Sequence, residues 1–147
     1  MSPLKTEIQG KVATLTLNRP AQMNTIDLGM AKALYEASLS FTEHSTVRAL
    51  IITGAGEKAF CAGGDLAAFN QHGEAIGEHL HEVTHYLHGA ISRFARMSLP
   101  VITAVNGVTA GGGLAFLGFP QLVLASESAR FVSAYTKAGL SPDGSST

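Results

Sequence analysis

The 147-residue sequence predicts an α/β fold. Short, apolar, β-branched segments alternate along the chain with longer segments whose apolar residues recur at helical spacing, which is typical of a sheet covered by helices. Two of the short segments are followed by glycine-rich stretches, Phe60-Cys61-Ala62-Gly63-Gly64-Asp65 and Gly111-Gly112-Gly113. Because the sequence holds no internal repeat, linker or low-complexity segment, we expect one domain over residues 1–147.

The first third of the chain predicts a pair of strands and a helix. Residues 8–12 read as a tight turn, and Val12–Leu17 alternates apolar with polar residues until Pro20 prevents further pairing. Asp27 is placed to cap a helix that begins at Leu28 and ends near Thr42. The apolar residues of this helix fall on one face: Met30, Ala33, Leu34, Ala37 and Phe41.

The middle of the chain predicts a buried strand, a loop and a long helix. The segment Val47–Thr53 is apolar and β-branched, and Gly54–Asp65 after it is a loop rich in glycine. A helix is expected from about Gly77 to Met97, because its apolar residues form a single stripe: Leu80, Val83, Thr84, Leu87, Ile91 and Phe94.

The last third predicts three further strands and a short helix. The first strand is Val101–Val105, and the helix begins in the triple glycine and continues through Leu117. Leu122–Ala125 is expected to be a buried strand, and Ala129–Val132 a short one. Strands and helices that alternate in this way support the α/β architecture.

Composition limits the partners of the protein. Hydrophobic residues make up 46% of the chain and charged residues 14%, so part of the surface is expected to face another protein. The net charge is −1, whereas binding to nucleic acid or to an anionic membrane calls for a basic excess. We therefore expect neither nucleic acid nor a membrane as a partner.

The sequence also indicates a compartment. Apolar runs fall short of the ~18 residues that span a bilayer, and the first residues lack a signal pattern. A chain with a single cysteine, Cys61, cannot form an internal disulfide and fits a reducing compartment. No basic residue adjoins Cys61 in the sequence to lower the pKa of its thiol, so we expect Cys61 to be a small buried hydrophobic residue. The expectation is a cytoplasmic protein, with an organellar protein that has lost its transit peptide as the alternative.

One glycine pattern resembles a dinucleotide-binding fingerprint. Gly54-Ala55-Gly56-Glu57-Lys58-Ala59 follows a predicted strand and matches G-x-G-x-x-G/A. That motif has to open a helix directly, but Gly63 and Gly64 disfavour a helix here. We interpret the segment as the exit from a strand into a loop.

A cluster of histidines invites a metal-binding interpretation. His81, His85 and His88 share a helical face, and Glu78 and Glu82 stand three residues before the first two. Di-iron sites, however, take such carboxylate and imidazole pairs from different helices that face one another. We interpret the cluster as a solvated polar face and expect no metal.

The two glycine segments offer a different chemistry. Glycine has no Cβ, so its backbone N–H groups stay uncovered. Two such N–H groups brought together can hold a carbonyl oxygen that gains negative charge during a reaction. The alternative is that both segments are closely packed turns.

Four motifs together resemble the crotonase family, which is the enoyl-CoA hydratase/isomerase superfamily. They cover nearly the whole chain in the family's order: Leu17-Asn18-Arg19-Pro20 with Asn24, Phe60–Leu66, Ala104–Gly113 and Gly139–Thr147. The resemblance implies a crotonase-like spiral of ββα repeats whose C-terminal helical part is absent from this sequence. It also implies that an acyl-CoA thioester is the substrate, with coenzyme A as part of that substrate and no other cofactor.

The resemblance assigns residues to the site. The backbone amides of Gly64 and Gly112 would hold the thioester oxygen while an enolate develops. The backbone around Ala62, Gly63, Asp65 and Leu66 would hold the adenine and pantetheine parts of coenzyme A.

The choice of reaction depends on carboxylates. The two glutamates of the family's hydratases correspond to Ala115 and Tyr135, which are not acids. Asp143 stands where several of the family's isomerases place a single acid, and one carboxylate suffices to move a proton from one carbon to another. The alternative is that Asp143 is only a turn residue, because aspartate is common in a turn after proline. We expect a Δ3–Δ2 enoyl-CoA isomerase, with hydration or another superfamily reaction, or a non-catalytic acyl-CoA binder or inactive fragment, as alternatives.

The family's chains continue beyond the segment that resembles Gly139–Thr147. The resemblance implies that the missing helices complete the acyl pocket and make most subunit contacts. We therefore expect either a fragment or an unusual minimal member, and a homotrimer or dimer of trimers for the full-length protein.

Overall fold

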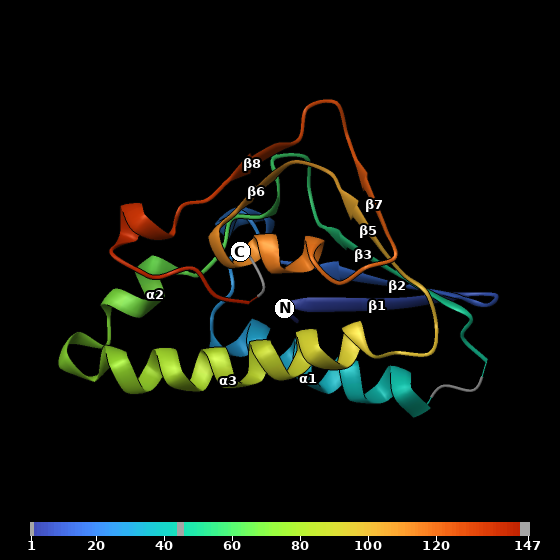
Figure 1. Ribbon diagram of the computed structural model, residues 1–147, viewed down its shortest axis with the longest axis horizontal. Helices are drawn as coiled ribbons and strands as arrows, with labels where there is room; N and C mark the ends of the chain where they lie inside the picture. Colours follow the sequence, from blue (N-terminus) through green and yellow to red (C-terminus); the bar gives the residue numbers. More distant parts are fainter. Residues whose placement is uncertain (1, 44–45, 145–147) are drawn as a thin grey trace.

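The computed structural model describes residues 2–43 and 46–144 (Figure 1). Residues 145–147, the end of the last family-like segment, lie outside the described residues. The helices and strands follow one another in this order: β1 Leu4–Gln9, β2 Val12–Leu17, η1 Pro20–Gln22, α1 Leu28–Glu43, β3 Ala49–Gly54, β4 Ala59–Cys61, α2 Leu66–Asn70, η2 Gly73–Ala75, α3 Ile76–Ala95, β5 Val101–Val105, β6 Val108–Ala110, η3 Gly111–Leu117, β7 Leu122–Ala125, β8 Arg130–Val132 and η4 Tyr135–Ala138.

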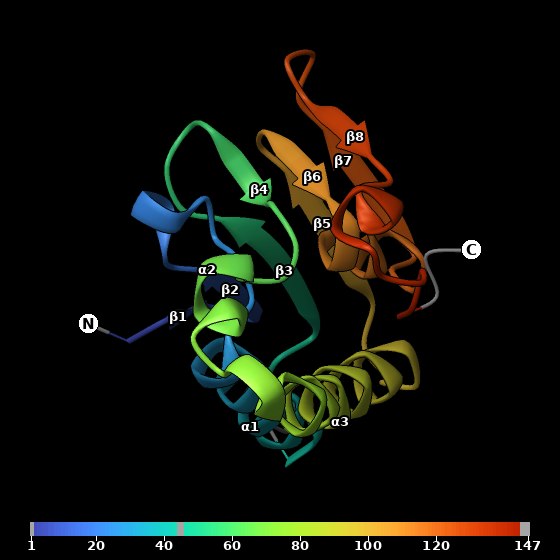
Figure 2. The ribbon, with the colours of Figure 1, turned by 90° about the vertical axis from the view of Figure 1, so that its left-hand side faces the viewer.

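In the described part of the chain, the strands form two sheets. The larger sheet has the order β1-β2-β3-β5-β7, and the smaller sheet has the order β4-β6-β8. The strands β1 and β2 pair antiparallel, and the other neighbouring strands of both sheets pair parallel. Figure 2 shows β4, β6 and β8 side by side, with α1 and α3 together below the strands.

The chain repeats one unit as it moves along the two sheets. In the described residues, a strand of the larger sheet is followed three times by a strand of the smaller sheet and then by a helix. The three units are β3-β4-α2, β5-β6-η3 and β7-β8-η4. This arrangement confirms the predicted α/β fold with a spiral of ββα repeats. Because parallel neighbours end at the same edge of a sheet, it also brings the segments after β4 and β6 together.

The predicted cap of α1 and the apolar faces of α1 and α3 explain how these two helices cover the sheet. The N–H of Met30 donates to Asp27 Oδ1 over 2.7 Å, which confirms Asp27 as the cap of α1. The buried face of α1 includes Ala31 and Ser38 as well as Met30, Leu34 and Phe41 of the predicted stripe, and α3 packs against this helix. The other two predicted residues, Ala33 and Ala37, are only partly buried. No helix in residues 2–43 and 46–144 is long and apolar enough to cross a membrane.

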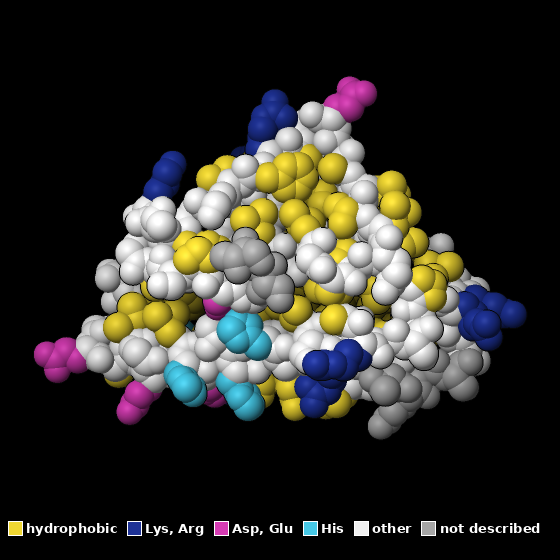
Figure 3. Space-filling view, in the orientation of Figure 1, with side chains coloured by type: hydrophobic (Ala, Val, Ile, Leu, Met, Phe, Trp, Pro, Cys, Tyr) yellow, Lys and Arg dark blue, Asp and Glu magenta, His cyan; other side chains and the backbone are white. Residues whose placement is uncertain are grey.

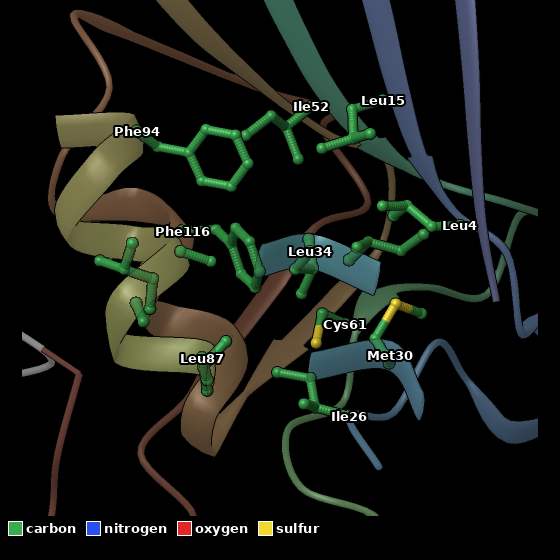
Figure 4. Close-up of a cluster of buried hydrophobic side chains, with 14 of the residues drawn as sticks. Leu4, Leu15, Ile26, Met30, Leu34, Ile52, Cys61, Leu87, Phe94 and Phe116 are labelled. Carbon is green, nitrogen blue, oxygen red and sulfur yellow. The ribbon is translucent and has the colours of Figure 1, made fainter. Parts of the chain in front are cut away.

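The core lies between the larger sheet, the helices α1 and α3, and η3. Figure 4 shows Phe94 of α3 and Phe116 of η3 beside Ile52 of β3, with Leu15 of β2 and Leu34 of α1 nearby. All five side chains are almost completely buried. Since an aromatic side chain in a core buries ~150–250 Å², this cluster fixes η3, and with it the triple glycine, against the sheet.

The segment Gly54–Asp65, predicted to be a loop, contains the strand β4. The strand has three residues, all buried, and pairs with β6, another strand that the sequence did not reveal. A run of three residues next to glycine is too short to show the alternation that identifies a strand.

The strand β7 forms where it was predicted but is exposed rather than buried. The side chains of Leu122 and Leu124 are 48% and 56% exposed, and Phe131 in β8 is exposed as well. The strands β7 and β8 are edge strands of their two sheets, and no described helix covers them. Figure 3 shows hydrophobic side chains gathered on this face, in the region where Figure 1 places β7 and β8.

Candidate active site

The two glycine segments lie against each other at one edge of the smaller sheet. Gly63 and Gly64 follow β4, and Gly111-Gly112-Gly113 begins directly after β6, its parallel neighbour. A Cβ on Gly63 would lie 2.7 Å from the carbonyl oxygen of Ala110 and 3.3 Å from the nitrogen of Gly112. Gly63 also has φ +93°, a backbone conformation that favours glycine. Only glycine fits where these two backbones approach so closely.

Cys61 packs closely against the second glycine segment, at Gly113. A side chain on Gly113 would collide with the carbonyl oxygen of Cys61 and would lie 3.0 Å from its Cβ. Burial raises the pKa of the Cys61 thiol to about 12, although the backbone N–H of Gly63 opposes this effect. The thiol is therefore neutral near pH 7, and the prediction of a small buried hydrophobic residue is confirmed.

The direction of the Gly64 N–H follows from the hydrogen bonds around it. The N–H of Ile26 donates to the Gly63 carbonyl over 2.8 Å, and the N–H of Asp65 donates to the Ile26 carbonyl over 2.9 Å. The C=O and N–H of one trans peptide unit point in opposite directions. Since the Gly63 carbonyl points toward Ile26, the N–H of Gly64 points away from it.

Gly112, the second predicted donor, lies at the beginning of η3. It is the second residue of this 3-10 helix, and the first N–H groups of a helix have no acceptor inside it. A Cβ on Gly112 would lie 4.0 Å from the hydroxyl of Tyr135, which is an ordinary contact. The Gly112 backbone is therefore held near the surface of the cavity described next.

A cavity of about 140 Å³ brings the three predicted catalytic residues together. Gly64, Gly112 and Asp143 line it, although they lie in three separate parts of the sequence. The other lining residues are mostly apolar and come from the segment before α1, from α2 and α3, and from the chain that begins at η4: Ile26, Phe69, Leu80, Val83, Thr84, Leu87, Tyr135, Leu140 and Ser141. Such a lining is typical of a pocket for a mainly apolar ligand.

Tyr135 and His88, both in the described part of the chain, contact the carboxylate of Asp143. The Tyr135 hydroxyl donates to Oδ1 over 2.8 Å, and His88 Nε2 lies 3.1 Å from Oδ2. The side chain of Asp143 is 33% exposed and that of His88 is 45% exposed. The carboxylate thus lies on the boundary between the cavity and solvent, held at both oxygens.

The structure also shows what stands at the two positions of the hydratase glutamates. Ala115 is buried in η3, and a Cβ on Gly144 would lie 3.0 Å from the Ala115 Cβ. The Asp143-Gly144 turn therefore packs directly over Ala115. Tyr135, at the other position, donates its hydroxyl hydrogen to Asp143.

Asp65 has a structural role in addition to its predicted one. Its Oδ1 accepts from the N–H of Ala68 over 3.1 Å and caps α2, and its Oδ2 pairs with Arg19 over 2.8 Å. Burial would raise the pKa of Asp65, but the Ala68 N–H and Arg19 outweigh that effect and hold the pKa below its ordinary value. The carboxylate is engaged inside the protein, and so is the backbone, because the N–H of Asp65 donates to the Ile26 carbonyl and its own carbonyl accepts from the N–H of Phe69.

The remaining residues predicted to hold coenzyme A flank the glycines. Leu66 is exposed, Ala62 is partly buried, and Gly63 is buried against the second glycine segment. The alternative fingerprint at Gly54–Ala59 leads into the strand β4. It therefore lacks the helix N-terminus that a dinucleotide's pyrophosphate requires.

The three histidines that were predicted to form a polar face of α3 divide into two groups. His81 and His85 are exposed, in agreement with a solvated polar face, whereas His88 contacts Asp143. Sequence reasoning missed this contact because the two residues are 55 positions apart and helical spacing gives no sign of it. Within residues 2–43 and 46–144, no three His, Cys, Asp or Glu side chains are grouped so as to hold a metal ion.

The two sheets wound by ββα units, with paired glycine segments at one edge, define a protein of the crotonase fold. The family model described as enoyl-CoA hydratase/isomerase matches residues 12–147, and the chain belongs to this family. It is 38% identical over 97% of its length to 1,2-epoxyphenylacetyl-CoA isomerase of Escherichia coli K12 and 36% identical over 91% to mitochondrial 3-hydroxyisobutyryl-CoA hydrolase of Danio rerio.

A solved structure of an enoyl-CoA hydratase has the same fold as this chain. An enoyl-CoA hydratase from Polaromonas sp. JS666 superposes with a TM-score of 0.88 at 33% identity, covering 96% of this chain and 55% of that one. The chain covers 55% of the Escherichia coli relative and 35% of the Danio rerio relative. It therefore spans between about a third and a half of the proteins that it matches.

Proposed function

We propose that this chain carries the active site of an enoyl-CoA isomerase. The observation that supports the proposal is that Gly64, Gly112 and Asp143 line one and the same mainly apolar cavity. A pair of backbone donors and one carboxylate on the same cavity are the groups that a proton shift next to a thioester requires. The reaction belongs to the whole protein, of which this chain supplies the glycine segments and the acid.

The proposed reaction moves one proton between two carbons. The Asp143 carboxylate removes a proton from C2 of a 3-enoyl-CoA, and the electron pair passes through C1 to the thioester oxygen. The amides of Gly64 and Gly112 hold the resulting dienolate oxygen. Protonated Asp143 then returns a proton to C4, the double bond settles between C2 and C3, and the carboxylate is regenerated.

Isomerisation is preferred over hydration because the site offers one carboxylate. Adding water across a double bond benefits from separate groups that activate water and protonate carbon. Ala115 carries no acid, and the Tyr135 hydroxyl is committed to the Asp143 carboxylate. Tyr135 therefore supports the single acid rather than acting as a second one.

A second candidate is an isomerisation of a cyclic acyl-CoA. The relative from Escherichia coli is named 1,2-epoxyphenylacetyl-CoA isomerase and is 38% identical to this chain. A rearrangement of a ring thioester would use the same oxyanion donors. Product analysis over linear 3-enoyl-CoAs and ring acyl-CoAs separates the two candidates.

Two further proposals concern binding and assembly. The backbone from Ala62 to Leu66 would hold the adenine and pantetheine parts of coenzyme A, and within this segment Leu66 is exposed while Ala62 and Gly64 are partly buried. The whole protein would assemble as a homotrimer or a dimer of trimers. The exposed apolar strands β7 and β8 support an assembly in which other protein covers them.

The test of the proposed function is the Asp143→Asn variant of the purified protein. Asparagine keeps the size of the side chain but cannot accept the proton, so turnover of 3-enoyl-CoA to 2-enoyl-CoA should fall about 10²–10⁴-fold. The exposed Glu127→Gln variant is the control and should keep full activity. Full activity in Asp143→Asn would refute the role of Asp143, and acyl-CoA binding without turnover by the wild type would support a non-catalytic binder instead.

A further inference from the structure

The site cavity has the size of one compact apolar group. Its volume is about 140 Å³. A dry apolar cavity of ~150 Å³ inside a protein accommodates benzene, a molecule of six carbon atoms. The proposed reacting groups belong to the same space, because Gly64, Gly112 and Asp143 line it. A thioester whose oxygen is held by the two glycines therefore has room for an acyl group of about six carbons.

Phe69 of α2 forms a wall of this cavity directly beside Gly64. The edge of the ring lies against the glycine, since a Cβ on Gly64 would be 2.6 Å from Phe69 Cε2 and 3.0 Å from Cζ. Phe69 is only 5% exposed. The ring consequently has no room to move toward the first glycine segment.

Two histidine rings support Phe69 from outside the cavity. His79 packs edge-on against Phe69 with the ring centroids 5.7 Å apart, and His72 stacks on His79 with the centroids 3.6 Å apart. Neither histidine is among the residues that line the cavity. The Nε2 atom of His79 is shielded from solvent, so the rings are closely packed at this point. Phe69 is thus fixed between Gly64 and the two histidines.

The helix α3 provides another wall, which is also apolar. Leu80, Val83 and Leu87 line the cavity, and the last two are almost completely buried. Thr84 lines it as well, but its hydroxyl donates to the Leu80 carbonyl of the same helix over 2.8 Å. The helix therefore offers hydrophobic contact to a ligand rather than hydrogen bonds.

We propose that Phe69 limits the acyl group of the substrate to about six carbons, an inference that rests on the proposed function. A longer chain has to displace packed side chains or leave the cavity, and forcing extra methylene groups into a packed interior is unfavourable. The ring cannot yield toward Gly64 or toward His79. The substrate class is therefore the short-chain acyl-CoA thioesters.

The experiment is calorimetric titration of the 147-residue protein with saturated acyl-CoA thioesters, from butanoyl-CoA to dodecanoyl-CoA. These thioesters lack the double bond, so they report binding without turnover. The affinity of the wild type should rise about fourfold with each added carbon, as one more CH2 group is buried. The rise should end near hexanoyl-CoA, and a rise that continues to dodecanoyl-CoA would overturn the inference.

Two variants test the wall itself. Phe69→Ala removes the ring, and the rise in affinity should then continue to decanoyl-CoA. Because the loss of a buried ring can unfold a protein, Phe69→Val, which retains part of the apolar packing, is the second variant and should extend the rise to octanoyl-CoA. Ile76→Ala, on α3 but outside the cavity lining, is the matched control. A folded Phe69→Val variant with the wild-type chain-length profile would overturn the role of Phe69.

Turnover measurements separate this inference from the proposed function. The expected binding profile without isomerisation of 3-hexenoyl-CoA would refute the proposed reaction but not the limit on chain length. Equal efficiency with 3-hexenoyl-CoA and 3-dodecenoyl-CoA would refute the limit and leave the reaction intact. Failure of the wild type to bind any of these thioesters would overturn both.

Discussion

At the scale of the residue, Asp65 and Asp143 show how environment separates two carboxylates. Asp65 is buried, caps α2 and pairs with Arg19, so its charge stabilises the fold. Asp143 lies at the edge of a cavity, held by Tyr135 and His88, with a third of its side chain exposed. The first carboxylate is fixed inside the fold, and the second lies where the cavity meets solvent.

The lowered pKa of Asp65 predicts how stability depends on pH. The unfolded chain binds this proton with an ordinary pKa of about 3.9, and the folded protein binds it more weakly. The ionised form therefore contributes stability above about pH 4, and this contribution is lost as pH falls through the lower folded pKa. Asp65→Asn should unfold about 1–3 kcal/mol more easily at pH 6–8, and the difference should shrink in acid.

Urea unfolding of the wild type and the variant over a pH series measures this effect. Glu57→Gln, a change in an exposed loop, serves as the control and should leave the pH profile unchanged. A difference between wild type and Asp65→Asn that stays constant from neutral pH to pH 2 would contradict the assignment.

At the scale of the element, the side chains of two asparagines, Asn24 and Asn106, connect the loops that end the strands. Asn24 is fully buried, and its amide donates to the carbonyls of Ala55 and Ala59 over 2.9 Å while its Oδ1 accepts from the N–H of Arg19. Asn106 donates in the same manner to the Gly54 and Gly56 carbonyls. These bonds tie the turn after β2 and the end of β5 to the β3–β4 loop, which leads to the first glycine segment.

Asn24→Ala should therefore destabilise the protein by about 2–4 kcal/mol, because buried backbone groups lose their partners. Asn24 also has φ +55°, which adds strain to an alanine. Asn24→Gly removes the strain but not the loss of hydrogen bonds, and chemical denaturation should still show most of the destabilisation. Wild-type stability in Asn24→Gly would show that the hydrogen bonds contribute little.

The elements also show how far the sequence could predict the structure. The strands Val12–Leu17 and Val101–Val105 form with the predicted bounds, and α3 differs from its prediction by only a few residues, because their apolar periodicity is long enough to be distinctive. The strands β4 and β6 have three residues each and show no periodicity. The glycines of the site could be predicted from their pattern, whereas the contact of His88 with Asp143 depends on how the last segment folds back over α3.

At the scale of the whole molecule, both sheets end in exposed apolar strands. The strand β7 closes the larger sheet and β8 closes the smaller one, and their side chains are exposed. Edge strands with apolar side chains promote association, because they offer both unpaired backbone groups and hydrophobic surface.

The 147-residue chain, produced alone, should therefore associate in a concentration-dependent way. The double variant Leu122→Lys with Leu124→Lys should shift the sedimentation profile toward the monomer, since charge on an edge strand opposes pairing. Leu39→Lys, a comparably exposed leucine on α1, is the control and should leave association unchanged. A double variant that associates as strongly as the wild type would show that these strands are not the contact surface.

The contact between Gly63 and the Ala110 carbonyl has a consequence for how the family changes over time. Groups supplied by the main chain survive any replacement of the side chains around them, as long as the glycines that permit the contact are kept. Residues 88, 115, 135 and 143 can then be exchanged without dismantling the place where the substrate carbonyl is proposed to bind. If the main-chain contacts stay constant while these side chains change, related proteins can differ in the reaction that they catalyse. The relatives reported above are named as an isomerase, a hydrolase and a hydratase, as this reasoning expects.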